Sequence, residues 1–177
     1  MRTSVNVANA VTVARIAIVP LVAQAMIRAQ RRGGSPVLAA ALFNAVALSD
    51  ALDGHLARSR DSETDFGRVV DPLADKALIA GALGVLVHQR RLAPWPAVAI
   101  VAREAAVTAM RAVVGLRGVV VPASRLAKRK TTLQFGAVTA LIVAPDPGAA
   151  WTRALVHCAV LLTVASGVEY FVNVRSS

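Results

Sequence analysis

The sequence predicts an all-α integral membrane protein with six transmembrane helices. Hydrophobic residues make up 56% of the 177 residues, and the mean hydropathy is +0.58. The apolar residues form long blocks, whereas the strands of a membrane β-barrel would give short alternating segments, so helices are expected. A chain of this length normally forms one domain, and we expect a single membrane-embedded domain over residues 1–177.

Six apolar blocks can be compared with the ~20 residues that a spanning helix needs. They lie at residues 8–28, 36–57, 67–88, 94–114, 131–145 and 150–173. Pro20 falls inside the first block, where neighbouring helices can satisfy the freed backbone group. The fifth block is the shortest, and a start near Ser124 is also consistent with the sequence. Glycine and proline residues separate several of the blocks.

Lysine and arginine are distributed unevenly between the two ends of these helices. Six spans place both termini on one side, together with residues 58–68 and 115–130. Only six of the 20 basic residues fall on the other side: Arg28, Arg31, Arg32, Arg90, Arg91 and Arg153. Because positive charge marks the cytoplasmic side, both termini and residues 49–76 are expected to be cytoplasmic. Aromatic residues make up only 4% and do not interleave with the basic ones, so no nucleic-acid partner is expected.

Residues 49–76 place four aspartates beside apolar segments, where an unpaired carboxylate is costly: Asp50, Asp53, Asp71 and Asp75. The first two are three positions apart and the last two are four apart, so each pair shares one face of a helix. A short turn at 59–66 would make the two helices antiparallel neighbours and let the carboxylates converge. They would repel one another unless cations held them together. Oxygen-only ligands favour hard divalent ions, so we expect two Mg²⁺ or Mn²⁺ ions.

Small residues between the aspartates leave room for a ligand. Gly54 and Ala57 clear one face of the second helix, and Gly67 clears the start of the third, so a bulky group could approach the backbone. Arg58 supplies a positive charge for a phosphate. In the alternative interpretation, the acids form a solvated rim with nearby basic residues: Arg58, Arg60, Arg68 and Lys76.

The pattern Asp50-x-x-Asp53-Gly54-x-x-Ala57-Arg58, then eight residues and Gly67-x-x-x-Asp71-x-x-x-Asp75, resembles the signature of the CDP-alcohol phosphotransferase family. Every fixed position and spacing matches. Other segments resemble the bacterial branch that forms phosphatidylglycerol phosphate: Asn9 to Arg15 with Thr12, Pro20, 71–76, Arg103-Glu104, Arg111, 122–124 and Lys128-x-Lys130-Thr131-x-x-Gln134. Ala127 differs, because this branch usually has a glycine before the first lysine.

The resemblance implies a six-helix enzyme of the bacterial plasma membrane, usually a homodimer, with a cytoplasm-facing cavity. It implies transfer of the phosphatidyl group from CDP-diacylglycerol to sn-glycerol 3-phosphate, with phosphatidylglycerol phosphate and CMP as products. The four aspartates would hold the two metal ions, and Asp75 would also take the proton from the attacking hydroxyl. CDP-diacylglycerol would contact six residues: Asn9, Thr12, Gly54, Ala57, Arg58 and Gly67.

Glycerol 3-phosphate carries a dianionic phosphate, so its pocket needs fixed positive charge. The candidates are Arg103, Arg111, Lys128 and Lys130. Arg103 lies within an apolar block, where an ionisable residue is by default a functional hypothesis. A structural ion pair between Arg103 and the neighbouring Glu104 is the alternative.

Two other functions are consistent with parts of the sequence. A cardiolipin synthase of the same superfamily would use phosphatidylglycerol as the acceptor. A small divalent-cation transporter would also need carboxylates in its helices, but near the bilayer midplane. The acids here lie at helix ends, and no inverted repeat is visible, so the transferase is favoured.

Overall fold

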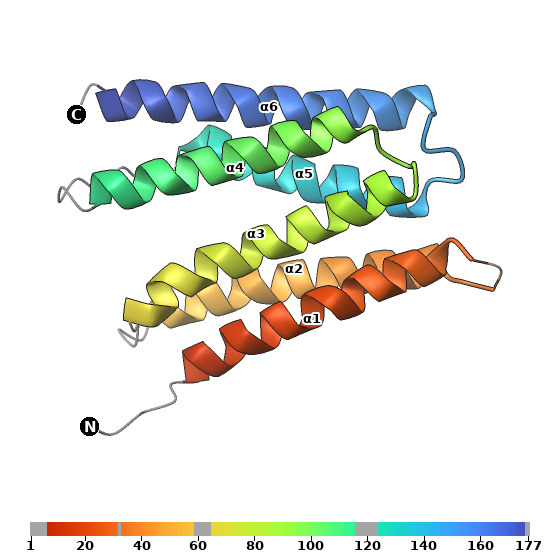
Figure 1. Cartoon of the computed structure of the whole chain (residues 1–177), viewed down its shortest axis with the longest axis horizontal. Coiled ribbons are helices and arrows are strands. Elements are labelled where there is room, and N and C mark those ends of the chain that lie inside the picture. Colours follow the sequence, from red (N-terminus) through yellow and green to blue (C-terminus); the bar gives the residue numbers. More distant parts are fainter. Residues whose placement is uncertain (1–6, 32, 59–64, 116–123, 176–177) are drawn as a thin grey trace. The chain divides into compact units, whose positions relative to one another are not determined.

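The computed structural model describes residues 7–31, 33–58, 65–115 and 124–175, with side chains described at 17–31, 33–49, 76–115, 124 and 126–175. Within this part of the chain, every regular element is a helix, which confirms the predicted all-α class. The helices in Figure 1 are α1 (Val7–Ala29), α2 (Pro36–Arg58), α3 (Asp65–His88), α4 (Pro94–Gly115), α5 (Arg125–Val143) and α6 (Ala150–Arg175).

Five of the helices begin and end within two residues of the predicted blocks, and α1 continues through Pro20. The fifth block was predicted at 131–145, with a start near Ser124 as the alternative, and α5 begins at Arg125 in agreement with that alternative. The Ser124 side chain caps this helix by accepting a hydrogen bond from the Ala127 N–H at 3.1 Å. The earlier start escaped the hydropathy pattern because the first two turns are basic. The helix ends before Pro145, since Ala144 is extended (φ −60°, ψ 127°) as a residue preceding proline must be.

The first of two compact units covers residues 1–85 and contains α1, α2 and most of α3. Helices α1 and α2 pack against each other, with Met26 and Phe43 buried to 1% and 0% exposure. The sharp turn between them depends on two glycines. Gly33 has a φ of +78°, and a β-carbon on Gly34 would lie 2.2 Å from the Arg28 carbonyl oxygen. In the same unit, α3 buries Leu78, Ile79, Ala82 and Leu83.

The second unit covers residues 86–177, and in it α6 packs against both α4 and α5 (Figure 1). The buried residues of α6 recur every three or four positions, as expected for one face of a helix: Thr152, Val156, Ala159, Val160, Thr163, Ser166, Gly167 and Tyr170. Gln134 of α5 donates a hydrogen bond to the Thr163 hydroxyl at 2.8 Å, so this packing includes a buried polar contact. The face of α6 away from its neighbours is apolar and exposed, with Leu161 at 68% and Val168 at 59%.

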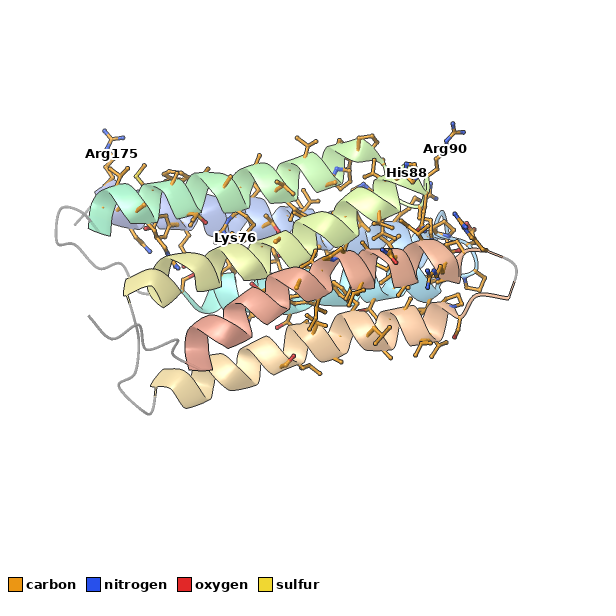
Figure 2. All side chains as sticks on the ribbon, turned by 60° about the horizontal axis from the view of Figure 1, so that its bottom comes forward. Lys76, His88, Arg90 and Arg175 are labelled. Atoms are coloured by element: carbon orange, nitrogen blue, oxygen red, sulfur yellow. The ribbon has the colours of Figure 1, made fainter. Side chains whose placement is uncertain are left out.

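The connection between α3 and α4 contains two arginines with different surroundings. Arg90 has a φ of 58° and is exposed, and Figure 2 shows its side chain projecting away from the ribbon. Arg91 turns toward the end of α5, where its Nε donates to the Leu141 carbonyl at 2.8 Å and its Nη2 donates to the Ala144 carbonyl. A cation at a helix C-terminus also interacts favourably with the helix dipole. Burial lowers the pKa of Arg91, but arginine stays protonated in proteins.

Among the residues that the structure describes, α6 is long and apolar enough to cross a membrane, and shorter apolar helical stretches lie at 17–29, 36–49 and 76–88. Trp95 and Trp151, 51% and 55% exposed, lie in the first turns of α4 and α6. The low aromatic content gave no sign of this placement. Charged residues interrupt α4 and α5, so the predicted six spans remain a prediction.

We expect Arg91→Ala to lower the melting temperature of the detergent-solubilised protein. The variant loses two charge-assisted hydrogen bonds at the end of α5, and the half-buried site reduces their combined value to about 2 kcal/mol. That loss corresponds to roughly 4–8 °C for a chain of this size. Arg90→Ala removes the same charge from the neighbouring exposed position and should have little effect. Equal melting temperatures for the two variants would contradict the role assigned to Arg91.

Candidate functional site

The four predicted metal ligands lie on two helices that are consecutive in the chain. Asp50 and Asp53 belong to the last turns of α2, and Asp71 and Asp75 lie in the first half of α3. The backbone is helical at all four, so each pair shares a helix face as the spacing predicted. Residues 59–64 connect the two helices. The side chains themselves lie outside the described residues, so their convergence on metal ions stays a prediction.

The predicted nucleotide contacts also lie outside the described side chains. Asn9 and Thr12 lie on α1, while three of the others belong to α2 and one to α3: Gly54, Ala57, Arg58 and Gly67. Among the described side chains, no group of three or more His, Cys, Asp or Glu residues could hold a metal ion. The side chains of Asp50, Asp53, Asp71 and Asp75 lie outside that part of the chain, so the donor set predicted from the sequence stays a prediction.

The second unit brings two of the four predicted acceptor cations together on one carboxylate. The Arg103 Nη1 donates to Glu104 Oε1 at 3.1 Å, and the Lys130 ammonium group forms an ion pair with the same oxygen. The side chains are 11%, 14% and 5% exposed, respectively. We call these three residues the Glu104 cluster. The ion pair considered as an alternative for Arg103 is therefore present, while phosphate binding by Arg103 and Lys130 remains a prediction.

The other two predicted cations are exposed. The Arg111 guanidinium carbon lies 5.4 Å from the centre of the Tyr170 ring, within the range of a cation–π interaction. Lys128 lies on α5, half a turn before Lys130, with its side chain exposed. Residues 86–177 contain eleven Lys and Arg residues and three Asp and Glu residues, so positive charge is in excess in this part of the sequence. Such an excess can bind an anionic group.

Helix α6 contributes contacts that sequence reasoning missed. Ser166 accepts a hydrogen bond from Arg103 Nη2 at 3.0 Å, and Glu169 accepts one from the Ser124 hydroxyl at 2.6 Å. Tyr170 is the ring beneath Arg111. One signal could have been noticed, because Glu169 is the one acidic residue in an otherwise apolar segment. The serine and tyrosine carried no comparable signal.

Comparison with known proteins places these residues in a family context. A family model described as CDP-alcohol phosphatidyltransferase matches residues 5–165. A Bacillus subtilis protein named CDP-diacylglycerol–glycerol-3-phosphate 3-phosphatidyltransferase is 38% identical, covering 94% of this chain and 93% of the relative. A Mycobacterium tuberculosis protein named probable phosphatidylglycerophosphate synthase is 40% identical, covering 93% and 79%. A Rickettsia prowazekii protein with the same name as the Bacillus relative is 33% identical, covering 97% and 96%.

The Glu104 cluster predicts an energetic coupling between Glu104 and Lys130. Glu104→Gln leaves two buried cations without their carboxylate, which should lower the free energy of unfolding by about 2–3 kcal/mol. Adding Lys130→Met removes one of those cations, so the double variant should recover part of the loss. Thermal or denaturant unfolding in detergent measures the stability of the wild type, the two single variants and the double variant, which together form a double-mutant cycle.

Arg129→Met provides the control, because Arg129 is an exposed cation next to Lys130. It should change stability little, alone or combined with Glu104→Gln. If the Glu104→Gln and Lys130→Met effects add to within ~0.5 kcal/mol, the two side chains do not interact energetically.

Proposed function

The chain belongs to the CDP-alcohol phosphatidyltransferase family, and we propose that it transfers the phosphatidyl group of CDP-diacylglycerol to sn-glycerol 3-phosphate. The products are phosphatidylglycerol phosphate and CMP. The observation that carries this proposal is that relatives named for this reaction match nearly the whole chain at 33–38% identity. The complete spacing of residues 50–75 supports the same reaction.

The proposed donor site is built on the four aspartates of α2 and α3. The family generally depends on a divalent metal ion. Four carboxylates on two helices provide the oxygen donors that Mg²⁺ or Mn²⁺ prefers, and two ions would nearly balance their charge. We assign Asp50, Asp53, Asp71 and Asp75 as the ligands. Bound ions would neutralise the pyrophosphate and increase the electrophilicity of the β-phosphorus.

The reaction moves one proton and exchanges one phosphorus–oxygen bond. A hydroxyl oxygen of glycerol 3-phosphate attacks the β-phosphorus, and the bond from that phosphorus to the bridging oxygen of CMP breaks. Asp75 accepts the hydroxyl proton as a general base. The proposed CDP-diacylglycerol site has six residues. Gly54, Ala57 and Gly67 leave room for the cytidine, and Arg58 interacts with the phosphates. Asn9 and Thr12 form hydrogen bonds with the nucleotide.

The proposed acceptor site uses the cations of the second unit. The phosphate of glycerol 3-phosphate is held by four residues: Arg103, Arg111, Lys128 and Lys130. The excess of Lys and Arg over Asp and Glu in residues 86–177 supports this assignment, because a dianionic phosphate needs fixed positive charge. Lys128 and Arg111 are exposed, which leaves their charges accessible to a ligand.

The membrane arrangement is also proposed. We infer six spans in the bacterial plasma membrane, with both termini and residues 49–76 in the cytoplasm, and one domain over residues 1–177 that forms a homodimer. The exposed apolar face of α6, the exposed tryptophans of α4 and α6, and the distribution of basic residues all suit a bilayer. The family match also extends through both compact units.

Topology and assembly can be measured directly. In a Cys158→Ala background, single cysteines placed in residues 59–64 should react with a membrane-impermeant thiol reagent only in inside-out vesicles. The detergent-solubilised protein should sediment as a dimer. Labelling of intact cells at residues 59–64 would reverse the orientation, and a monomer at all concentrations would remove the dimer.

One assay tests the function. Purified protein with CDP-diacylglycerol and Mg²⁺ should release CMP when glycerol 3-phosphate is present, and not with phosphatidylglycerol or inositol phosphate. EDTA should abolish the release, and Mg²⁺ or Mn²⁺ should restore it. CMP release with phosphatidylglycerol alone would establish a cardiolipin synthase instead, and metal uptake by vesicles without CMP release would favour a transporter.

Asp75→Asn keeps the size of the side chain while removing its basicity. We expect turnover to fall by about 10²–10⁴-fold, the range typical for loss of a general base. Binding of CDP-diacylglycerol should be reduced much less, because three other aspartates remain. Single-turnover kinetics separates the two effects, and near-normal turnover would exclude Asp75 from proton transfer.

Lys128→Ala should raise the KM for glycerol 3-phosphate by roughly ten- to a hundred-fold, because a charge-assisted phosphate contact is lost. The KM for CDP-diacylglycerol should stay within a few-fold of wild type. Arg129→Ala is the matched control, since it removes an exposed cation from the adjacent position of α5. Equal effects of the two variants would mean that Lys128 acts through general surface charge and has no specific contact with the acceptor.

A further inference from the structure

We propose that one turn of α6, residues 166–170, positions the cations that bind the phosphate of the acceptor. Three side chains of this turn contact residues from α4 or from the start of α5, and a β-carbon added to Gly167 would meet Arg103. The inference rests on the proposed function and adds to it a set of positioning residues in a helix that carries no recognised motif.

The first contact is a hydrogen bond to the Arg103 terminal nitrogen that Glu104 does not bind. Arg103 Nη1 bonds to Glu104 and Nη2 bonds to the Ser166 hydroxyl at 3.0 Å. The Ser166 hydroxyl in turn donates to the Thr163 carbonyl at 2.9 Å, so its own orientation is fixed. Ser166 is 1% exposed. The plane of the guanidinium is therefore held at both terminal nitrogens.

The second contact is the close approach of Arg103 to the backbone of α6. A β-carbon on Gly167 would lie 3.2 Å from Arg103 Cγ and 3.4 Å from Nε. The first distance is tighter than ordinary van der Waals contact, so an alanine would shift the arginine side chain by a few tenths of an ångström. Glycine is unfavourable inside a helix, where it costs about 1 kcal/mol relative to alanine. Its presence at residue 167 is explained by the space that Arg103 occupies.

Of the other two contacts, one is with the residue that caps α5 and the other is with Arg111 itself. Glu169 accepts a hydrogen bond from the Ser124 hydroxyl at 2.6 Å, and the same hydroxyl caps the helix that carries Lys128 and Lys130. Tyr170 places its ring beneath Arg111. One turn of α6 thus contacts two arginines of α4 and the cap of α5.

Arg103 has N–H groups that no described residue uses. Two of its five N–H groups have protein partners, one on each terminal nitrogen. Nε is buried without a partner and lies against Gly167, so a bound phosphate would use the second N–H group of Nη1 or Nη2. Fixing the guanidinium in place before the ligand arrives lowers the entropy lost on binding.

The test compares KM values for glycerol 3-phosphate and CDP-diacylglycerol. Ser166→Ala removes the hydroxyl bonded to Arg103, and Gly167→Ala inserts a β-carbon against its stem. Each should raise the KM for glycerol 3-phosphate about 5- to 20-fold, less than Arg103→Ala, because misplacement weakens a phosphate contact without deleting it. The KM for CDP-diacylglycerol should not change. Gly167→Ala should not lower the melting temperature, since alanine favours the helix.

Two matched controls separate positioning from packing. Thr163→Val removes another buried hydroxyl from the same face of α6, but that hydroxyl bonds to Gln134 and not to Arg103. Gly136→Ala adds a methyl group to a helix where no atom lies within 4 Å of the new β-carbon. Both should leave the acceptor KM unchanged. In an Arg103→Ala background, Gly167→Ala should raise the KM no further, because the side chain that it displaces is absent.

The outcomes distinguish this inference from the proposed function. If Arg103→Ala raises the acceptor KM while Ser166→Ala and Gly167→Ala behave like the controls, the positioning role is wrong and the proposed function stands. If wild type releases no CMP with glycerol 3-phosphate, the proposed function fails, and calorimetric binding of glycerol 3-phosphate and inorganic phosphate then decides. Weaker binding by Gly167→Ala than by Gly136→Ala would support positioning of an anion site. Equal binding, or none in wild type, would overturn the inference.

Discussion

An ionised side chain inside an apolar helical unit needs a partner, and in residues 86–177 Glu104 meets this need for two cations at once. Its Oε1 accepts a hydrogen bond from Arg103 of the same helix and pairs with Lys130 of α5. Helices α4 and α5 each pack on α6, and the Lys130–Glu104 pair links them directly. The positions of the buried charges and of the three helices are therefore set together. Moving α4 relative to α5 would separate Lys130 from Glu104, and moving α6 would separate Ser166 from Arg103.

Such a cluster is a poor way to gain stability. Transferring ions from water into a low-dielectric interior costs several kcal/mol for each ion, and well-packed apolar residues often do equally well or better. What the cluster adds is a fixed geometry, because the Arg103 guanidinium is held by Glu104 and by the Ser166 hydroxyl. A guanidinium held in place before a ligand arrives suits the proposed acceptor site, since less entropy is lost on binding.

The helices could be predicted from the sequence because apolar blocks, and the glycine or proline residues that separate them, determine helix formation through neighbouring residues alone. The start of α5 was predicted only as an alternative to residue 131, since Lys128 and Lys130 make its first turns look like a loop, although one of them is buried to 4% exposure. The sequence shows that a side chain is charged, but whether it is buried depends on the helices that pack around it. The shared helix face of each aspartate pair could be predicted, because residues three and four apart share a face wherever the helix lies. Ser166 and Gly167 are ordinary residues of apolar helices, and only their contacts with Arg103 distinguish them.

The proposed donor and acceptor sites are carried by different parts of the chain. The aspartates belong to residues 1–85, and the four cations belong to residues 86–177. The two transferase reactions considered share CDP-diacylglycerol and differ in the acceptor, so the cations of the second unit are the residues that can distinguish them. Glycerol 3-phosphate has a phosphate monoester that carries up to two negative charges, whereas phosphatidylglycerol has a diester that carries one. Fixed cations attract the dianion more strongly, and its unsubstituted oxygens can accept more hydrogen bonds. The proposed acceptor cations, with Arg103 held in place by Glu104 and Ser166, therefore favour the small soluble acceptor over the lipid.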